Sequence, residues 1–406
     1  MLRALLRKSL LCGVASLSVI CCTAGDGSQA DTVTLTADDA EVEQLYERGV
    51  LYAKQKEFSK AVDAFTEALS HGRYTFELLL MRSRSYLELK QYESALADAS
   101  SAIYLRPRNP IGYMLRAAVY GRMDHVNGVV ADATRAIQLN PTVGEYYVTR
   151  AAGYLRLGEP EKALNDLTAA LSLGENNSDV YLDRGLAWKQ LGRYEEALKD
   201  YSKSLELEPG SYLGLLRRGI VYRCLGQPRK AIGEFSAILA HNSPDLEARL
   251  QRAAAYTEAE DFSAALSDLR YGIEHDFRDP YMYLNLAYLY YRRNGIDEAL
   301  AANNSAMSLS NEPMRAAVLF QKGLILFKQG NEEEARKAYE EGRQMVVKTG
   351  AISGLDDGID DLRLAADLNG RGKDVVRQVL DDLEETRTML APQTKPNRAR
   401  CFKLRL

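Results

Sequence analysis

The sequence predicts an all-α protein built as a solenoid of tandem helix hairpins. An arginine recurs every 34 residues, a small residue follows it directly, and an aromatic residue comes three positions after the small one. A second small residue returns twelve positions after the first, where the partner helix of a hairpin is expected. Periods of this length are typical of stacked hairpins, because one hairpin alone cannot bury its apolar face.

Residues 1–30 are expected to be a signal peptide. Three positive charges in MLRALLRK precede a 14-residue apolar run that is too short to cross a bilayer comfortably. Ser28 to Ala30 then offer a small-x-small cleavage site. A mitochondrial transit peptide is the alternative, but the unbroken apolar run argues against it. We therefore expect an exported protein, which would be periplasmic, membrane-tethered or secreted.

The end of this segment, VICC, partly resembles a lipoprotein box. Val19 and Ile20 suit the motif, whereas Cys21 stands where Gly, Ala or Ser is normal. Lipidation of Cys22 would tether the chain to a membrane through its N-terminus. The alternative is a signal peptide that happens to contain cysteines. Residues 31–41 are then expected to form a short linker to the repeats.

Residues 42–349 are expected to form nine repeats. The small residues let two helices approach closely, the aromatic fills the gap between neighbouring hairpins, and proline ends the second helix of three repeats. The series of arginines consists of Arg48, Arg82, Arg116, Arg150, Arg184, Arg218 and Arg252.

Residues 181–209, YLDRGLAWKQLGRYEEALKDYSKSLELEP, contain all of these positions together. They resemble the tetratricopeptide repeat (TPR) superfamily, in the variant whose repeats begin Tyr-x-x-Arg-Gly. The resemblance covers about residues 42–349, and the ninth repeat has Lys322 in place of the arginine. It implies a right-handed superhelical solenoid of about nine repeats that binds other proteins or peptides.

An acidic residue lies sixteen positions after the arginine in repeats 2 to 7. In repeat 8 both residues are missing, as Leu286 and Ala302, which favours a pair inside each hairpin. The planar fork of arginine suits a carboxylate, so we predict half-buried structural ion pairs. The predicted pairs are Arg82–Asp98, Arg116–Asp132, Arg150–Asp166, Arg184–Asp200, Arg218–Glu234 and Arg252–Asp268.

Beyond the repeats, residues 350–390 are expected to form capping helices. Val375, Val379 and Leu383 are spaced four apart, which is typical of a packed helix face. A solenoid needs a terminal unit with a polar outer face. Residues 391–406 carry five Arg or Lys and no acid, and we expect a basic, flexible tail.

Composition and motifs exclude several classes of function. With 27% charged and 46% hydrophobic residues the chain is an ordinary folded protein, and a formal net charge of −4 predicts no nucleic-acid binding. The four histidines do not cluster, and the motifs of phosphate loops, nucleophile elbows and zinc proteases are missing. We therefore predict no enzyme activity, no metal and no cofactor.

In TPR proteins the first helices of the repeats line a concave groove. Carried onto this chain, the groove has a basic, partly apolar strip in repeats 3 to 6 and an aromatic patch in repeats 8 and 9. An extended peptide with acidic residues and an aromatic or aliphatic anchor would suit it. The predicted partner-binding residues are Arg122, Arg156, Lys189, Arg217, Arg223, Tyr281, Tyr288, Tyr291, Arg292, Phe320 and Phe327.

The function that the sequence favours is an exported interaction scaffold that holds partner proteins in an envelope assembly. One alternative is a non-catalytic accessory subunit that recruits or regulates an envelope enzyme. Another is a structural protein that self-associates through its ends.

Overall fold

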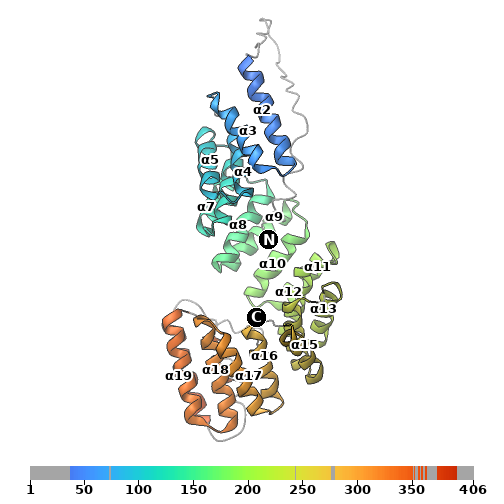
Figure 1. Ribbon diagram of the computed structural model, residues 1–406, viewed down its shortest axis with the longest axis vertical. Coiled ribbons are helices and arrows are strands. Elements are labelled where there is room, and N and C mark those ends of the chain that lie inside the picture. The colour runs from blue at the N-terminus through green and yellow to red at the C-terminus, as the bar shows by residue number, and fades with distance from the viewer. Residues whose placement is uncertain are drawn as a thin grey trace. The chain divides into compact units, whose positions relative to one another are not determined.

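The computed structural model describes residues 37–72, 75–242, 244–275, 279–350, 352, 355–356, 358–359, 362–363 and 373–390. Within these residues it contains nineteen helices and no strand (Figure 1). The predicted signal peptide, Cys22 and the predicted basic tail lie outside the described residues. No helix in the described part is both long enough and apolar enough to cross a membrane.

The chain divides into two compact units, one ending at Glu175 and the other starting at Asn176. Unit 1 contains four helix hairpins that stack in chain order. They are α2 (Ala37–Lys54) with α3 (Phe58–Ser70), α4 (Phe76–Glu88) with α5 (Tyr92–Leu105), α6 (Pro110–Arg122) with α7 (Val126–Leu139), and α8 (Gly144–Leu157) with α9 (Pro160–Ser172).

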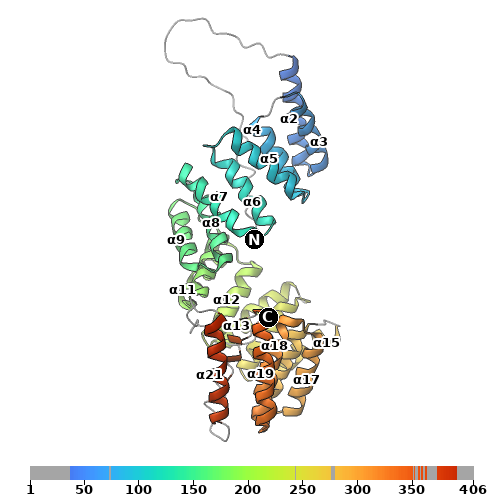
Figure 2. The ribbon, with the colours of Figure 1, turned by 90° about the vertical axis from the view of Figure 1, so that its left-hand side faces the viewer.

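Unit 2 contains five further hairpins and a final helix. The hairpins are α10 (Ser178–Gln190) with α11 (Tyr194–Leu207), α12 (Tyr212–Cys224) with α13 (Pro228–His241), α14 (Leu246–Glu258) with α15 (Phe262–Glu274), α16 (Pro280–Arg292) with α17 (Ile296–Leu309), and α18 (Glu312–Gln329) with α19 (Glu332–Thr349). The final helix, α21 (Lys373–Leu390), packs against α19 (Figure 2).

Each of the nine hairpins turns through one residue with a positive φ at the same place in its repeat. In the fifth hairpin this residue is Gly192, and the next amide, that of Arg193, donates to the carbonyl of Trp188 at 2.9 Å. A left-handed residue lets a helix end in this way and satisfies its last carbonyls. The nine residues are Lys56, Lys90, Asp124, Gly158, Gly192, Gly226, Glu260, Asn294 and Gly330.

The small residue after each arginine faces the second helix of its own hairpin. A Cβ added to Gly185 would lie 2.6 Å from an atom of the Tyr201 ring, so only glycine fits there. Glycine likewise meets Phe65, Phe235 or Tyr339 in hairpins 1, 6 and 9. Close packing therefore explains why the first position is glycine where the second helix carries an aromatic ring.

The C-terminal end of unit 2 has a continuous apolar core. Leu355, Ile359 and Leu362 join Val379 and Leu383 of α21 in one buried cluster. This cluster also contains Phe320 of α18 and Tyr339 of α19. The helix predicted to cap the solenoid thus buries the face of the last hairpin.

Candidate functional site

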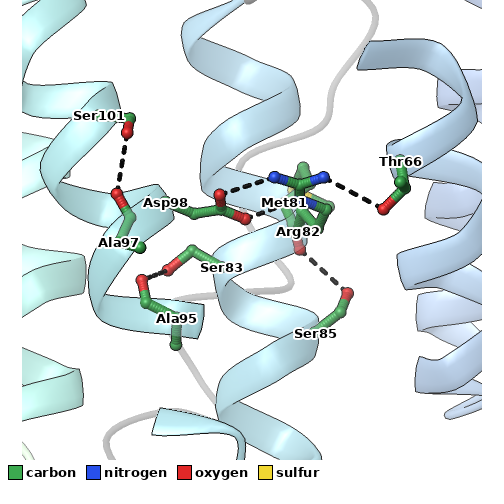
Figure 3. Close-up of polar contacts among 9 residues, drawn as sticks. All are labelled: Thr66, Met81, Arg82, Ser83, Ser85, Ala95, Ala97, Asp98 and Ser101. Carbon is green, nitrogen blue, oxygen red and sulfur yellow. Dashed lines mark hydrogen bonds and ion pairs between the residues drawn. The ribbon is translucent and has the colours of Figure 1, made fainter. Parts of the chain in front are cut away.

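The recurring arginine connects three helices. In α4, Nε and Nη2 of Arg82 donate to the two carboxylate oxygens of Asp98 on α5, at 2.7 and 2.8 Å (Figure 3). Its Nη1 donates to Oγ1 of Thr66 on α3 at 3.1 Å. The guanidinium therefore bonds to the second helix of its own hairpin and to the second helix of the hairpin before.

The same contacts repeat along both units. All six predicted pairs are present, with closest N–O distances of 2.6 to 2.8 Å. Their acidic side chains are 5 to 13% exposed, so the bonds are largely shielded from water. The hydrogen bond to the carboxylate raises the pKa of Arg116, Arg150, Arg184 and Arg252.

The hydroxyl that accepts from Nη1 was not anticipated from the sequence. It lies sixteen residues before the arginine, and the signal was a serine or threonine recurring at that position. Since both bonding partners come from the chain itself, the recurring arginine belongs to the framework. The hydroxyl residues are Thr66, Ser100, Thr134, Ser202 and Ser236.

Two residues of the predicted basic strip are bound within unit 2. The Arg223 side chain is only 3% exposed and bonds to Glu258 at 2.6 Å and to Gln251, both on α14. Arg217 donates to the carbonyl of Leu182 at 3.1 Å. The expectation that these two arginines bind a partner was therefore wrong. Acceptors on α14 already bond to Arg223, and a carbonyl of α10 already accepts from Arg217.

The other three cations of the strip are not fully buried. Arg156 forms an ion pair with Asp124 in the turn of the preceding hairpin, and its side chain is 41% exposed. Arg122 in unit 1 and Lys189 in unit 2 are half-buried. These three residues lie in the last turn of a first helix, where positive charge stabilises the helix dipole. Their position thus has a structural explanation before any ligand is considered.

The predicted aromatic patch divides into core and surface. Phe320 is 1% exposed in the core beneath α21, so its assignment to a binding surface was wrong. Phe327 stacks on Tyr339 with ring centroids 5.6 Å apart. Tyr281 packs against the buried cluster of Leu284 and Val318. The sequence placed all three on the groove because periodicity does not show which residues of a first helix are covered by neighbouring helices.

The remaining residues form a group that we call the cation–tyrosine cluster: Tyr288, Tyr291 and Arg292 of α16 with Lys328 of α18. The two tyrosine rings stack with centroids 6.2 Å apart. Lys328 Nζ lies 4.3 Å from the Tyr291 ring centroid and donates to the Tyr291 carbonyl at 2.6 Å. The Arg292 guanidinium lies 6.0 Å from the Tyr288 centroid.

Charge in this cluster is unevenly balanced. Arg292 Nη2 lies 3.3 Å from Glu260, whose side chain is 72% exposed. Partial burial, and then the positive charge of Arg292, lower the pKa of Lys328. Lys328 was missed from the sequence, although it occupies in the ninth hairpin the position that Arg292 has in the eighth. The cluster combines stacked rings with two cations that repel each other.

Family models match most of the repeat region. The tetratricopeptide repeat matches residues 46–110 and 178–211, and the tetratricopeptide repeat-like domain matches residues 225–361. The chain belongs to the tetratricopeptide repeat superfamily. Its stacked helix pairs form a TPR solenoid, and the TPR fold is generally a non-catalytic scaffold for protein–protein interaction.

The chain is also similar to solved structures of TPR proteins. A TPR protein from Parabacteroides merdae has 21% identity over 76% of this chain and 98% of its own, with a TM-score of 0.48. TTC0263, a thermophilic TPR protein of Thermus thermophilus, has 23% identity over 44% of this chain and 98% of its own, with a TM-score of 0.37. YrrB, described as a TPR protein with an unusual peptide-binding site, has 17% identity over 51% of this chain and 97% of its own, with a TM-score of 0.39. No curated protein sequence matches this chain.

Metal ligands do not gather in the described part of this TPR protein. No group of three His, Cys, Asp or Glu side chains there is placed to hold a metal ion. That the protein needs no metal or cofactor stays a prediction from the sequence.

Proposed function

We propose that this TPR protein is an exported interaction scaffold that holds an acidic segment of a partner protein on the cation–tyrosine cluster of unit 2. The observation that carries the proposal is the pairing of two stacked tyrosines with two cations on α16 and α18. An incoming carboxylate relieves the repulsion between Arg292 and Lys328, and the rings supply apolar contact area.

The position of the cluster supports this role. Tyr288 and Tyr291 are half-buried, so part of each residue remains exposed. Both residues lie on a first helix, within a rigid hairpin that is already folded. Little ordering entropy is therefore lost on the scaffold's side when a flexible segment binds. Cation–π contacts with Lys328 and Arg292 hold the rings in place.

The binding test uses peptides selected on the purified protein from a random peptide library displayed on phage. We expect the selected sequences to be enriched in Asp and Glu beside an apolar residue. Their dissociation constants, measured by fluorescence anisotropy, should rise about 30-fold in the Tyr288→Ala and Tyr291→Ala variants, as expected for aromatic anchors.

The matched control is Tyr104→Ala, because Tyr104 is 86% exposed on α5, a second helix of unit 1. Melting temperatures of all variants show whether the fold is retained. Equal loss of affinity in the Tyr104→Ala variant, or unchanged affinity in both cluster variants, would contradict the proposed binding surface.

Export and tethering are part of the same proposal and depend on residues 1–30. The intact mass of the protein recovered from the cell envelope should correspond to a chain that starts near Asp31, or at a lipidated Cys22. Labelling with a fatty acid that is lost in the Cys22→Ala variant would establish the tether. A full-length, unprocessed mass from the cytosolic fraction alone would contradict export.

A further inference from the structure

Cys224, the last residue of α12 in unit 2, is disulfide-bonded. It is half-buried, at the turn between the two helices of the sixth hairpin. The cysteine bonded to it lies outside the described residues, because all the other cysteines of the chain do. These are Cys12, Cys21, Cys22 and Cys401. The identity of the partner therefore follows from the sequence and from how the N-terminus is processed.

Processing of the N-terminus leaves one candidate, and this step rests on the export proposed above. Cleavage near Ala30 removes all three N-terminal cysteines with the signal peptide. Lipoprotein-type cleavage before Cys22 removes the first two, and the lipid then occupies the sulfur of Cys22 as a thioether. In either case Cys401 carries the one thiol that remains to pair with Cys224.

The sequence around Cys401 favours its reaction. Arg400 and Lys403 lie on either side of it, and neighbouring positive charge favours the thiolate, which is the form that attacks a disulfide. Cys224 lies at the C-terminal end of a helix, where the helix dipole does not stabilise a thiolate. Disulfides form and persist in the oxidising compartments that an exported protein reaches. Cys401 is therefore the cysteine that reacts first.

The C-terminal segment is long enough to turn back onto unit 2. The last helix, α21, ends at Leu390, and Cys401 follows eleven residues later. An extended segment of this length spans up to about 36–40 Å. Packed helices lie about 8–10 Å apart, so the segment can cross several of them. Both α21 and α12 belong to unit 2.

We propose that Cys224 and Cys401 form a disulfide that fastens the basic C-terminal tail to α12 in the exported protein. The Cys401 thiolate attacks the disulfide of an envelope thiol–disulfide oxidoreductase, forming a mixed disulfide and releasing one thiolate of that oxidant. The Cys224 thiolate then attacks the Cys401 sulfur and releases the second. Each cysteine loses one electron and one proton, and the disulfide of the oxidant is reduced to two thiols.

The link brings the tail to the ends of the first helices. Cys224 occupies the repeat position that Arg122, Arg156 and Arg292 have in hairpins 3, 4 and 8. On α14, which packs against α12, the turn residue Glu260 is 72% exposed and supplies negative charge beside the basic tail. The disulfide also closes a loop of about 180 residues, and a long closed loop restricts the unfolded chain strongly.

The linkage test uses the full chain expressed with its own N-terminus and recovered from the cell envelope. After denaturation in N-ethylmaleimide, we expect no label on Cys224 or Cys401 unless the protein is first reduced. A tryptic digest without reductant should contain peptide 224–229 joined to peptide 401–403. Cys401→Ser should leave Cys224 open to labelling, whereas Cys22→Ala should keep the joined peptides.

A stability measurement shows whether the link restrains the fold. A reductant should lower the melting temperature of wild type by about 5 °C or more, to that of Cys401→Ser, which should not change on reduction. Equal melting temperatures of oxidised and reduced wild type would contradict the restraint.

A second preparation separates the disulfide from export. The full-length Cys12→Ser/Cys21→Ser/Cys22→Ser variant, purified from cytosol and incubated with oxidised and reduced glutathione, should form the same joined peptides even if the chain is not exported. The proposal is overturned by a labelled Cys224 in this oxidised variant. It is also overturned if the envelope protein joins Cys224 to an N-terminal cysteine or to a second molecule.

Discussion

Gly185 and Tyr201 fit each other so closely that a single added carbon would collide with the ring, at 2.6 Å from Cε1 of Tyr201. Hairpins 4 and 7 have an alanine and a leucine at the same two positions, Ala151 with Leu167 and Ala253 with Leu269. In these three hairpins a larger residue at the first position is therefore accompanied by a smaller one sixteen positions later.

Gly185→Ala should lower the free energy of unfolding by about 1–3 kcal/mol, because the added methyl group overpacks the contact with Tyr201. The Gly185→Ala/Tyr201→Leu double variant should recover part of this loss, since it recreates the alanine–leucine pair. Urea denaturation monitored by circular dichroism measures both. Gly233→Ala is the control: no atom lies within 4 Å of its added Cβ, so it should be neutral or stabilising. A double variant less stable than the sum of both single changes would rule out this account.

Arg184→Leu should destabilise unit 2 by up to about 3 kcal/mol, because it leaves the carboxylate of Asp200, 7% exposed, without its partner. The Arg184→Leu/Asp200→Leu double variant should be more stable than the single variant, since no buried charge remains. Arg48→Leu is the matched control, because Arg48 and its partner Glu67 are 50% and 54% exposed. For Arg48→Leu the free energy of unfolding is expected to fall by only about 0–1 kcal/mol. Equal melting temperatures for the single and double Arg184 variants would show that the ion pair is not the cause.

Lys90→Gly should stabilise unit 1 by about 0.5–1 kcal/mol, because Lys90 has a φ of 62°, a conformation that glycine adopts without strain. The gain is smaller than the strain itself, because glycine also makes the unfolded chain more flexible. The reverse change, Gly192→Ala at a φ of 73°, should lower stability by a similar amount. Thermal unfolding should show a higher melting temperature for Lys90→Gly and a lower one for Gly192→Ala. A lower melting temperature for Lys90→Gly would contradict the proposed strain at this turn.

The free energy of unfolding should fall as pH rises from about 4 to 6, because of Asp183. Burial raises the pKa of its carboxyl from 3.8 to about 6, against the attraction of Arg217. Between these values the folded state holds more protons than the unfolded chain, so raising the pH favours unfolding. A pKa shift of this size changes the free energy of unfolding by at most about 3 kcal/mol.

Asp183→Asn should remove this contribution and be more stable than wild type at neutral pH. Denaturant titrations at pH 4.5 and 7 measure the difference, and Asp63→Asn, an exposed carboxyl on α3, controls for the loss of surface charge. Identical pH profiles for wild type and Asp183→Asn would exclude Asp183 as the source.

The repeat framework could be predicted because its contacts lie at constant sequence separations. Arg184 and Asp200 are sixteen residues apart, and a hairpin with two helices of set length brings such positions together wherever it occurs. The hydroxyls that accept from Nη1 follow the same rule across neighbouring hairpins and could have been found by the same counting.

The candidate site could be predicted only in part. Position in the repeat identified Tyr288, Tyr291 and Arg292 correctly as residues of first helices, but it treated Arg223 and Phe320 as equivalent to them. Lys328 was overlooked, because two extra residues before the ninth repeat shift it out of the 34-residue period.

The sequence by itself therefore determined the helix hairpins, their number, their turns and their internal ion pairs, because a 34-residue period fixes which positions meet. Tertiary structure decided which side chains remain available for a partner. Glu258 on the following first helix forms an ion pair with Arg223, and the apolar face under α21 buries Phe320, whereas Tyr288 and Tyr291 remain partly exposed. Burial and pairing depend on what the neighbouring helix presents, and that differs from one repeat to the next.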